Sequence, residues 1–237
     1  MRRLLLLSNS TNHGARYLDH AMPAIRALLA GARRLAFVPF ALRDQRGYTE
    51  RVRARFAEEG VEVAGVGADA AGRAAIEAAE AIFIGGGNTF RLLDLLQRSL
   101  LLEAVRGRAL AGTPYLGASA GTNVATPTLK TTNDMPIVQP ASFDALGLVP
   151  FQINPHYLDP DPASTHMGET REERIREFHE ENQTPVIGLR EGGWLQVEGA
   201  HGWVRGPRSA RLFRRGQAPA ELAPDAPLDA LLSSGSG

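Results

Sequence analysis

The chain of 237 residues contains no cysteine, which excludes disulfides, thiolate metal sites and a cysteine nucleophile. It also carries no net charge, with 26 basic and 26 acidic side chains, so no overall field favours nucleic acid or an anionic membrane surface. Lys130 is the only lysine, and a Ser–Lys dyad would depend on this one residue in an unplaced loop. No stretch approaches the roughly 20 apolar residues of a membrane span.

The apolar run near the N-terminus is short. Four leucines follow Arg2 and Arg3, but the run stops at Ser8 and falls short of the apolar region of a signal peptide. We therefore expect a buried first strand in a soluble, cytoplasmic protein with no membrane or nucleic-acid partner.

Apolar runs alternate with amphipathic stretches through the first half of the chain. Four runs lack polar alternation, as strands buried on both faces do: residues 4–7, 35–40, 61–66 and 81–84. Helix formers with apolar residues three and four apart fill the intervals: residues 17–29, 49–59, 69–80 and 90–101. This alternation predicts an α/β fold with a doubly wound, mostly parallel sheet and helices on both faces.

The second half is less regular. A loop-rich segment leads to a predicted strand at 148–153, a polar helix at 170–182 and a strand at 186–189. Three further runs predict a small C-terminal antiparallel meander: residues 194–197, 202–205 and 211–213. We expect a single α/β domain over residues 1–215, and a flexible tail over residues 216–237, which are rich in Ala, Pro, Ser and Gly.

Residues 117–121 read Gly-Ala-Ser-Ala-Gly and follow a short apolar run. This is the G-x-S-x-G pattern of a nucleophile elbow, in which a serine occupies a sharp strand-to-helix turn and glycines make room for its strained backbone. The pattern makes Ser119 a candidate nucleophile. The sharp turn also places the Ala120 amide to serve as one oxyanion donor.

His156 is the favoured base for Ser119, because it follows an apolar run and the turn residues Asn154 and Pro155 at an expected strand end. Glu191 follows the next predicted strand and is a candidate for the acid that orients the imidazole. Asp134 competes with it, either as this acid or as a support for its own loop. The other five histidines fall in predicted helices, loops or turns: His13, His20, His166, His179 and His201.

A glycine run at residues 85–87 follows a predicted strand and could bring a second backbone amide to the oxyanion. Phosphate binding is the rival interpretation of such a loop, but no Walker lysine or G-x-G-x-x-G pattern accompanies it. Asn88 is expected to cap the following helix and is also a candidate substrate contact.

The sequence Thr170-Arg171-Glu172-Glu173 matches a capping box. Arg171 then occupies the first helical position, where the macrodipole disfavours a cation. An arginine beside helix N-terminal amides could bind a carboxylate, so Arg171 is a candidate substrate anchor. A metal site is conceivable at His156, Asp159, Asp161 and His166. However, Asp159-Pro160-Asp161-Pro162 is first of all turn chemistry and no H-E-x-x-H motif accompanies it, so we expect no metal and no cofactor.

Several of these stretches together resemble the peptidase E (aspartyl dipeptidase) family of serine peptidases, whose fold is of the class I glutamine amidotransferase type with a flavodoxin-like core. The matching stretches run from the first strand to about residue 205 in the family's order: LLLLSNST at 4–11, GGGNTF at 85–90, the Ser119 elbow, TTNDMPIV at 131–138, QINPH at 152–156, GETR at 168–171, and VIGL at 186–189 with Glu191 and Gly192.

The resemblance implies a triad of Ser119, His156 and Glu191, an oxyanion hole formed by Ala120 with Gly87 or Gly86, and cleavage after an N-terminal aspartate. Two residues depart from the family pattern. Ala118 stands where a bulky tryptophan is expected, and Arg190 stands where proline is expected.

The function predicted from the sequence is hydrolysis of Asp-X dipeptides and short peptides through an aspartyl-Ser119 intermediate. Two alternatives stay open at this point. One is an α/β-hydrolase esterase, whose chain order would make His201 the base and Asp134 or Asp159 the acid. The other is a non-catalytic relative that binds acidic peptides. A homodimer is left open as well.

Overall fold

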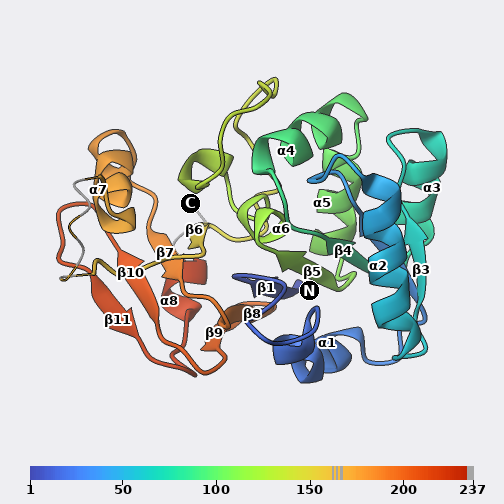
Figure 1. Ribbon diagram of the computed structural model, residues 1–237, viewed down its shortest axis with the longest axis horizontal. Helices are drawn as coiled ribbons and strands as arrows, with labels where there is room; N and C mark the ends of the chain where they lie inside the picture. The colour runs from blue at the N-terminus through green and yellow to red at the C-terminus, as the bar shows by residue number, and fades with distance from the viewer. Residues whose placement is uncertain (162, 164, 166–167, 234–237) are drawn as a thin grey trace.

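The computed structural model describes residues 1–161, 163, 165 and 168–233. Two sheets lie side by side, and helices pack around the larger one (Figure 1). In the described residues no helix has the length and apolar character that crossing a membrane requires.

The larger sheet has seven strands in the order β3-β2-β4-β5-β1-β8-β9. Its first five strands are parallel: β1 (Arg3–Leu7), β2 (Arg34–Val38), β3 (Glu62–Gly65), β4 (Ala81–Ile84) and β5 (Tyr115–Ala118). The antiparallel strands β8 (Trp194–Glu198) and β9 (His201–Arg205) complete it beside β1. The doubly wound, mostly parallel sheet expected from the sequence is confirmed.

Both faces of the sheet are buried along β1, β2, β4 and β5, which explains why these strands lack polar alternation. The edge strand β3 is mostly exposed, unlike the expectation for 61–66, and β8 and β9 alternate between buried and more exposed residues. Leu5 and Leu7 of β1 pack on one side with α1 (Met22–Leu29) and α2 (Gln45–Ala57), while Leu4 and Leu6 pack on the other. That second side is covered by α3 (Ala70–Ala78), α4 (Thr89–Arg98), α5 (Leu102–Leu110) and the short α6 (Ala120–Asn123). Two 3-10 turns complete this part: η1 (Asp19–Ala21) and η2 (Leu129–Thr131).

The smaller sheet has the order β11-β10-β7-β6. Its parallel pair, β6 (Gln152–Pro155) and β7 (Val186–Leu189), is joined through α7 (Arg171–Glu181), and β10 (Ala210–Phe213) and β11 (Ala220–Leu222) extend it in antiparallel fashion. The predicted single meander is therefore wrong. After β9 the chain turns at Gly206, which has φ +95° and approaches the Gly192 carbonyl, and this turn carries β10 into the smaller sheet.

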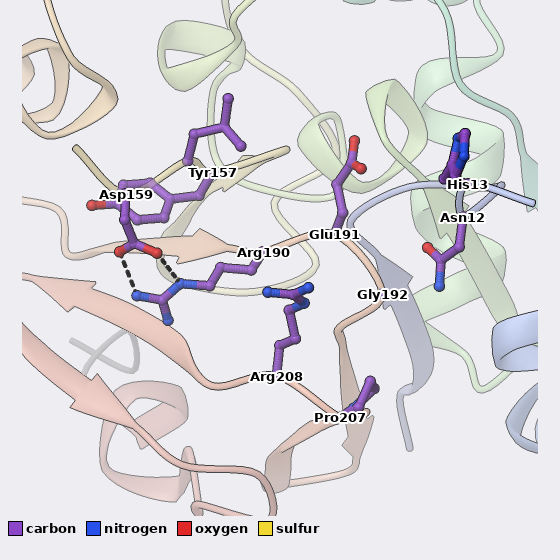
Figure 2. Close-up of a pocket in the computed structure, with 10 residues that line it drawn as sticks. Asn12, His13, Tyr157, Asp159, Arg190, Glu191, Gly192, Pro207 and Arg208 are labelled. Atoms are coloured by element: carbon purple, nitrogen blue, oxygen red, sulfur yellow. Dashed lines mark hydrogen bonds and ion pairs between the residues drawn. The ribbon is translucent and has the colours of Figure 1, made fainter. Parts of the chain in front are cut away.

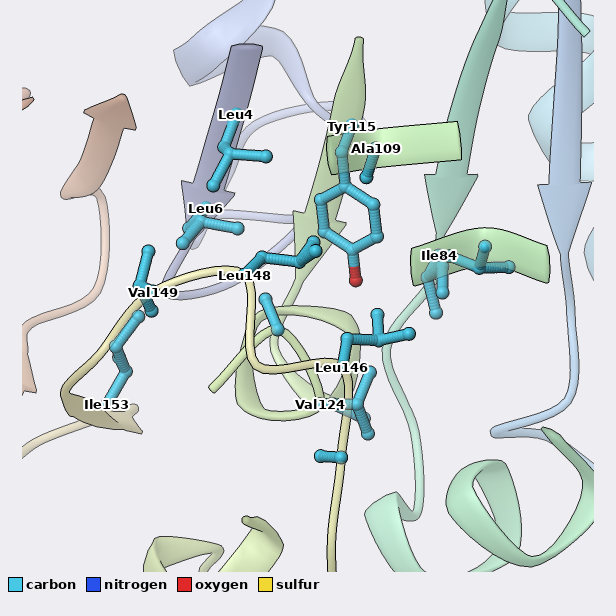
Figure 3. Packing of buried hydrophobic residues seen from close by; sticks show 14 of the residues in the cluster. Leu4, Leu6, Ile84, Ala109, Tyr115, Val124, Leu146, Leu148, Val149 and Ile153 are labelled. Carbon is cyan, nitrogen blue, oxygen red and sulfur yellow. The ribbon is translucent and has the colours of Figure 1, made fainter. Parts of the chain in front are cut away.

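Two other expectations differ from the structure. The helix expected at 90–101 ends at Arg98, because Leu100 takes a left-handed conformation (φ 58°), and α5 follows unanticipated. In the apolar run 148–153 only the end is a strand. Leu148 and Val149 instead fill the core over β1 and β5 as irregular chain (Figure 3). A buried run of this length does not by itself distinguish strand from packed loop.

The segment from residue 216 also differs from the flexible tail that its composition suggests. It forms β11 and α8 (Asp229–Ser233), and residues 234–237 lie outside the described part of the chain. Leu228, Leu231 and Leu232 are buried in the main hydrophobic cluster. Three spaced leucines supply enough apolar area to order a segment that is otherwise rich in Pro and Ala.

Two glycines offer a matched test of these packing arguments. A methyl group on Gly121 would lie 2.0 Å from the Ile84 carbonyl oxygen, whereas one on Gly107, exposed in α5, would meet nothing within 4 Å. We expect Gly121→Ala to lower the free energy of unfolding by more than about 2 kcal/mol. Gly107→Ala should raise it by about 0.5–1 kcal/mol through helix propensity. Urea unfolding measures both, and equal effects would contradict the close approach at Gly121.

Candidate active site

Ser119 stands at the turn between β5 and α6 with φ 53° and ψ −108°, a strained conformation for a residue other than glycine. The glycines on either side permit this turn. A Cβ on Gly117 would lie 2.7 Å from the Gly121 carbonyl oxygen, so the backbones approach too closely for any side chain. The Ser119 amide donates to the Leu7 carbonyl at 3.1 Å, which fixes the turn to the end of β1. The local geometry is that of a nucleophile elbow.

A continuous hydrogen-bonded chain leads away from Ser119. Its Oγ lies 2.8 Å from His156 Nε2, and His156 Nδ1 lies 2.6 Å from Glu191 Oε1. Because an ionised carboxylate only accepts, Nδ1 carries the proton and Nε2 is left to accept from the serine hydroxyl. His156 follows β6 and Glu191 follows β7, so the larger sheet supplies the serine and the smaller sheet supplies the other two residues.

The position of His156 depends on the buried side chain of Ser8. Ser8 Oγ accepts from the His156 amide at 2.9 Å and donates to the Leu189 carbonyl at 2.7 Å. Next to it, Asn9 Oδ1 accepts from the Gly192 amide at 2.8 Å and holds the loop that carries Glu191. The sequence places Ser8 and Asn9 directly after a strand, but nothing in the pattern indicates these partners.

Asp134 lies elsewhere. Its Oδ2 accepts from the Thr89 amide at 2.7 Å and from the Thr89 hydroxyl at 2.6 Å, at the start of α4. Of the two roles considered for Asp134, support of its own loop matches these contacts, whereas Glu191 is the carboxylate that contacts His156.

Two backbone amides near Ser119 remain available as donors. Neither Gly87 nor Ala120 donates a hydrogen bond to an acceptor among the described residues. Gly86 also lies beside the serine, since a Cβ there would be 3.1 Å from Ser119 Cβ. However, its backbone interacts with the Tyr48 hydroxyl: burial raises the pKa of Tyr48, and the hydrogen bond from Gly86 opposes that effect. Gly87 is thus the glycine whose amide is available, and its pairing with Ala120 stays a prediction.

Arg171 begins α7 behind the expected capping box, in which Thr170 and Glu173 satisfy each other's backbone amides. It lines an open cavity of about 520 Å³ together with Asn133, Thr170 and Arg174. Burial and then the charge of Arg174 lower the pKa of Arg171, and Asp134 opposes them. Arg171 makes no hydrogen bond or ion pair with another described residue, so its guanidinium is available to an anion.

Asn88 caps α4 as expected, because its Oδ1 accepts from the Arg91 amide at 3.0 Å. Its Nδ2 donates to the Met135 carbonyl at 2.9 Å. Both ends of the side chain are therefore engaged, and its role as a substrate contact stays a prediction.

His201 lies far from the elbow. Along β8 and β9 it pairs opposite Glu198, which in turn pairs with Arg3 at the opposite end of β1 from Ser8. Its imidazole contacts Asp229 at 2.8 Å, not Asp134 or Asp159. The arrangement required by the esterase alternative is absent from the described structure. His166 lies outside the described residues.

Arg190 holds the loop that carries Glu191. Its guanidinium contacts both oxygens of Asp159 at 2.6 and 2.7 Å, both oxygens of Glu221 on β11, and the backbone and side chain of Ser209. It also lies over the ring of Tyr157. Figure 2 shows the pair with Asp159 beside Glu191. The sequence identifies Arg190 only as a departure from the family pattern, and its partners come from three separate places in the chain: residues 157–159, Ser209 and Glu221.

Most of the chain matches a known protein family. Residues 4–203 match peptidase family S51. The chain belongs to this family. It is 60% identical to peptidase E of Streptomyces coelicolor over 229 aligned residues. These residues make up 97% of this chain and 94% of the relative. The chain is 49% identical over 234 residues to a probable alpha-aspartyl dipeptidase of Drosophila melanogaster, covering 98% of each.

Two solved structures share the fold of this S51 chain. One is a peptidase from an acI-B1 actinobacterium, with a TM-score of 0.72, 17% identity and 96% of each chain covered. The other is a putative peptidase E protein from Listeria monocytogenes EGD-e, with a TM-score of 0.68, 21% identity, 88% of this chain and all of that chain covered. The family resemblance inferred from scattered motifs is confirmed.

The two candidate acids can be separated by isosteric substitution. Glu191→Gln removes the charge that faces His156 and should lower kcat by about 10²-fold or more, because the imidazole loses its orienting carboxylate. Asp134→Asn, the matched control, should change kcat less than about tenfold and act through the position of α4. Steady-state kinetics with an aspartyl anilide measures both, and the reverse order would assign the acid to Asp134.

The Arg190 cluster predicts a stability that depends on pH. Its hydrogen bonds lower the pKa of Asp159 and of Glu221. The stabilisation is therefore complete at neutral pH and is lost as pH falls through these lowered values. Arg190→Ala should cost about 1–2 kcal/mol at pH 7, since solvent screens the half-exposed carboxylates, and less toward about pH 3. Urea unfolding at both pH values measures this, and a penalty independent of pH would contradict it.

Proposed function

We propose that this chain is a serine peptidase that hydrolyses the peptide bond after an N-terminal aspartate in dipeptides and short peptides. The observation that carries the mechanism is the chain of contacts from Ser119 through His156 to Glu191. The relatives' names, peptidase E and alpha-aspartyl dipeptidase, support the substrate.

In the proposed reaction His156 Nε2 takes the Ser119 proton as Oγ attacks the aspartyl carbonyl carbon. The Gly87 and Ala120 amides stabilise the resulting oxyanion, an interaction typically worth about 10²–10³ in rate per donor. His156 then gives its proton to the leaving amine, the C–N bond breaks, and an aspartyl-Ser119 ester remains. Water, deprotonated by the same imidazole, hydrolyses the ester and releases aspartate.

Arg171 is the proposed partner of the substrate's side-chain carboxylate. It is cationic and partly buried, and it makes no hydrogen bond or ion pair with a described residue. Its open cavity also contains Asn133, whose Nδ2 donates to the Pro155 carbonyl next to His156. A carboxylate placed there would make charge-assisted hydrogen bonds, and an uncharged asparagine side chain would leave the guanidinium without its counter-ion. The cytoplasmic location expected from the sequence stays a prediction.

Anilides of Asp, Asn and Ala test both parts of the proposal. Ser119→Ala should abolish turnover of the Asp anilide, because no nucleophile remains. Arg171→Ala should lower kcat/KM for the Asp anilide by about 10- to 100-fold and leave the low rates on Asn and Ala anilides nearly unchanged.

Arg174→Ala is the matched control, since Arg174 lines the same cavity but pairs with Glu169 at 3.4 Å. Turnover that survives Ser119→Ala would overturn the mechanism. An Asp preference that is equal in the wild type and in Arg171→Ala would remove the anchor.

A further inference from the structure

A second cavity, of about 440 Å³, is lined in part by residues 157–159 of the loop that follows His156 (Figure 2). Its lining includes Glu191, Arg190, Arg208 and Asn12, and it shares Leu158 and Asp159 with the cavity that contains Arg171. The two cavities are therefore neighbours separated by residues 158–159, and each contains at least one arginine.

The chemistry of the proposed reaction gives these cavities different occupants. The oxyanion faces the Gly87 and Ala120 amides on the larger sheet, whereas the leaving nitrogen must lie near His156 Nε2 to receive its proton. The residue that leaves is consequently on the side of His156 and Glu191. If Arg171 binds the aspartyl side chain, the cavity beside Glu191 is the one that remains for the leaving residue.

Only one of the two arginines in this cavity is free to bind an anion. Arg190 is saturated by Asp159, Glu221 and Ser209. Arg208 is exposed and makes no hydrogen bond or ion pair with any described residue. Figure 2 shows its side chain extending toward Arg190 and the loop of Glu191.

The backbone fixes Arg208 at this edge. A Cβ on Gly206 would lie 2.6 Å from the Gly192 carbonyl oxygen, so the turn before Arg208 packs directly on the residue after Glu191. Ala210, two residues further, pairs with Leu189 at the end of β7. The backbone on both sides of Arg208 is therefore held by contacts with β7 and the residues that follow it.

We propose that this cavity binds the leaving residue of the substrate and that Arg208 binds that residue's free α-carboxylate. Arginine suits a carboxylate because its planar guanidinium can donate two parallel hydrogen bonds. The positive charge would also offset repulsion between the incoming carboxylate and Glu191. The inference rests on the proposed aspartyl peptidase function and adds to it a preference for dipeptides over substrates whose second residue has no free carboxylate.

The test compares Asp-Leu with Asp-Leu-amide, which differ only in that carboxylate. The wild type should hydrolyse Asp-Leu with about tenfold higher kcat/KM, mainly through a lower KM. Arg208→Ala should lose this advantage while keeping its activity on the amide, and Arg208→Lys should restore part of it. Unchanged activity on the amide also shows that the variant is folded.

Arg214→Ala is the matched control. Arg214 follows β10 at its other end, next to Phe213, which pairs with Val186 at the start of β7. The Arg214→Ala variant should leave the ratio of kcat/KM for Asp-Leu to that for Asp-Leu-amide unchanged. Equal ratios in the wild type and in Arg208→Ala, with both substrates hydrolysed, would overturn the inference and leave the proposed function intact. If the wild type hydrolysed none of Asp-Leu, Asp-Leu-amide and the Asp anilide, both the inference and the proposed function would be overturned.

Discussion

The candidate site depends on one hydroxyl group that joins two sheets. The serine elbow belongs to the larger sheet, and the imidazole and carboxylate belong to the smaller one. The distances between these groups therefore depend on the contacts that hold the two sheets together. Ser8 Oγ bridges the two sheets by accepting from the His156 amide and donating to the Leu189 carbonyl. Each hydrogen bond of this buried hydroxyl contributes only about 1 kcal/mol net to the free energy of unfolding. Its main effect is therefore to fix the position of His156 relative to the larger sheet.

Most of the larger sheet could be predicted because its signals are local. Buried parallel strands give unbroken apolar runs, and the elbow glycines and the Thr170 capping box have short signatures. The path of β10 could not be predicted, because the contact of Gly206 with the Gly192 carbonyl that redirects it joins residues distant in sequence. Nor could the order of residues 216–233, because a few spaced leucines among Pro and Ala have no period of their own.

The candidate site shows the same division. Ser119, His156 and Glu191 each follow an apolar run, and the topology of parallel strands brings such positions to one edge. The choice between Glu191 and Asp134 stayed open, because Asp134 lies in a loop-rich segment that the sequence does not place, and its carboxylate could also orient the histidine. The structure places Asp134 on Thr89 and Glu191 on His156. Which carboxylate meets the imidazole depends on how two sheets pack, and one sequence carries no local record of that.

The two sheets also divide the electrostatic work. The larger sheet presents a neutral hydroxyl and backbone amides, which suit a charge that develops only during the reaction. The smaller sheet and its loops carry the permanent charges: Glu191, Arg171, Arg190 and Arg208. Its outermost strand contributes Glu221, which neutralises Arg190 and so keeps that guanidinium from competing with Arg208 for an anion. The C-terminal segment therefore supplies one of the two carboxylates that occupy Arg190, and Asp159 supplies the other.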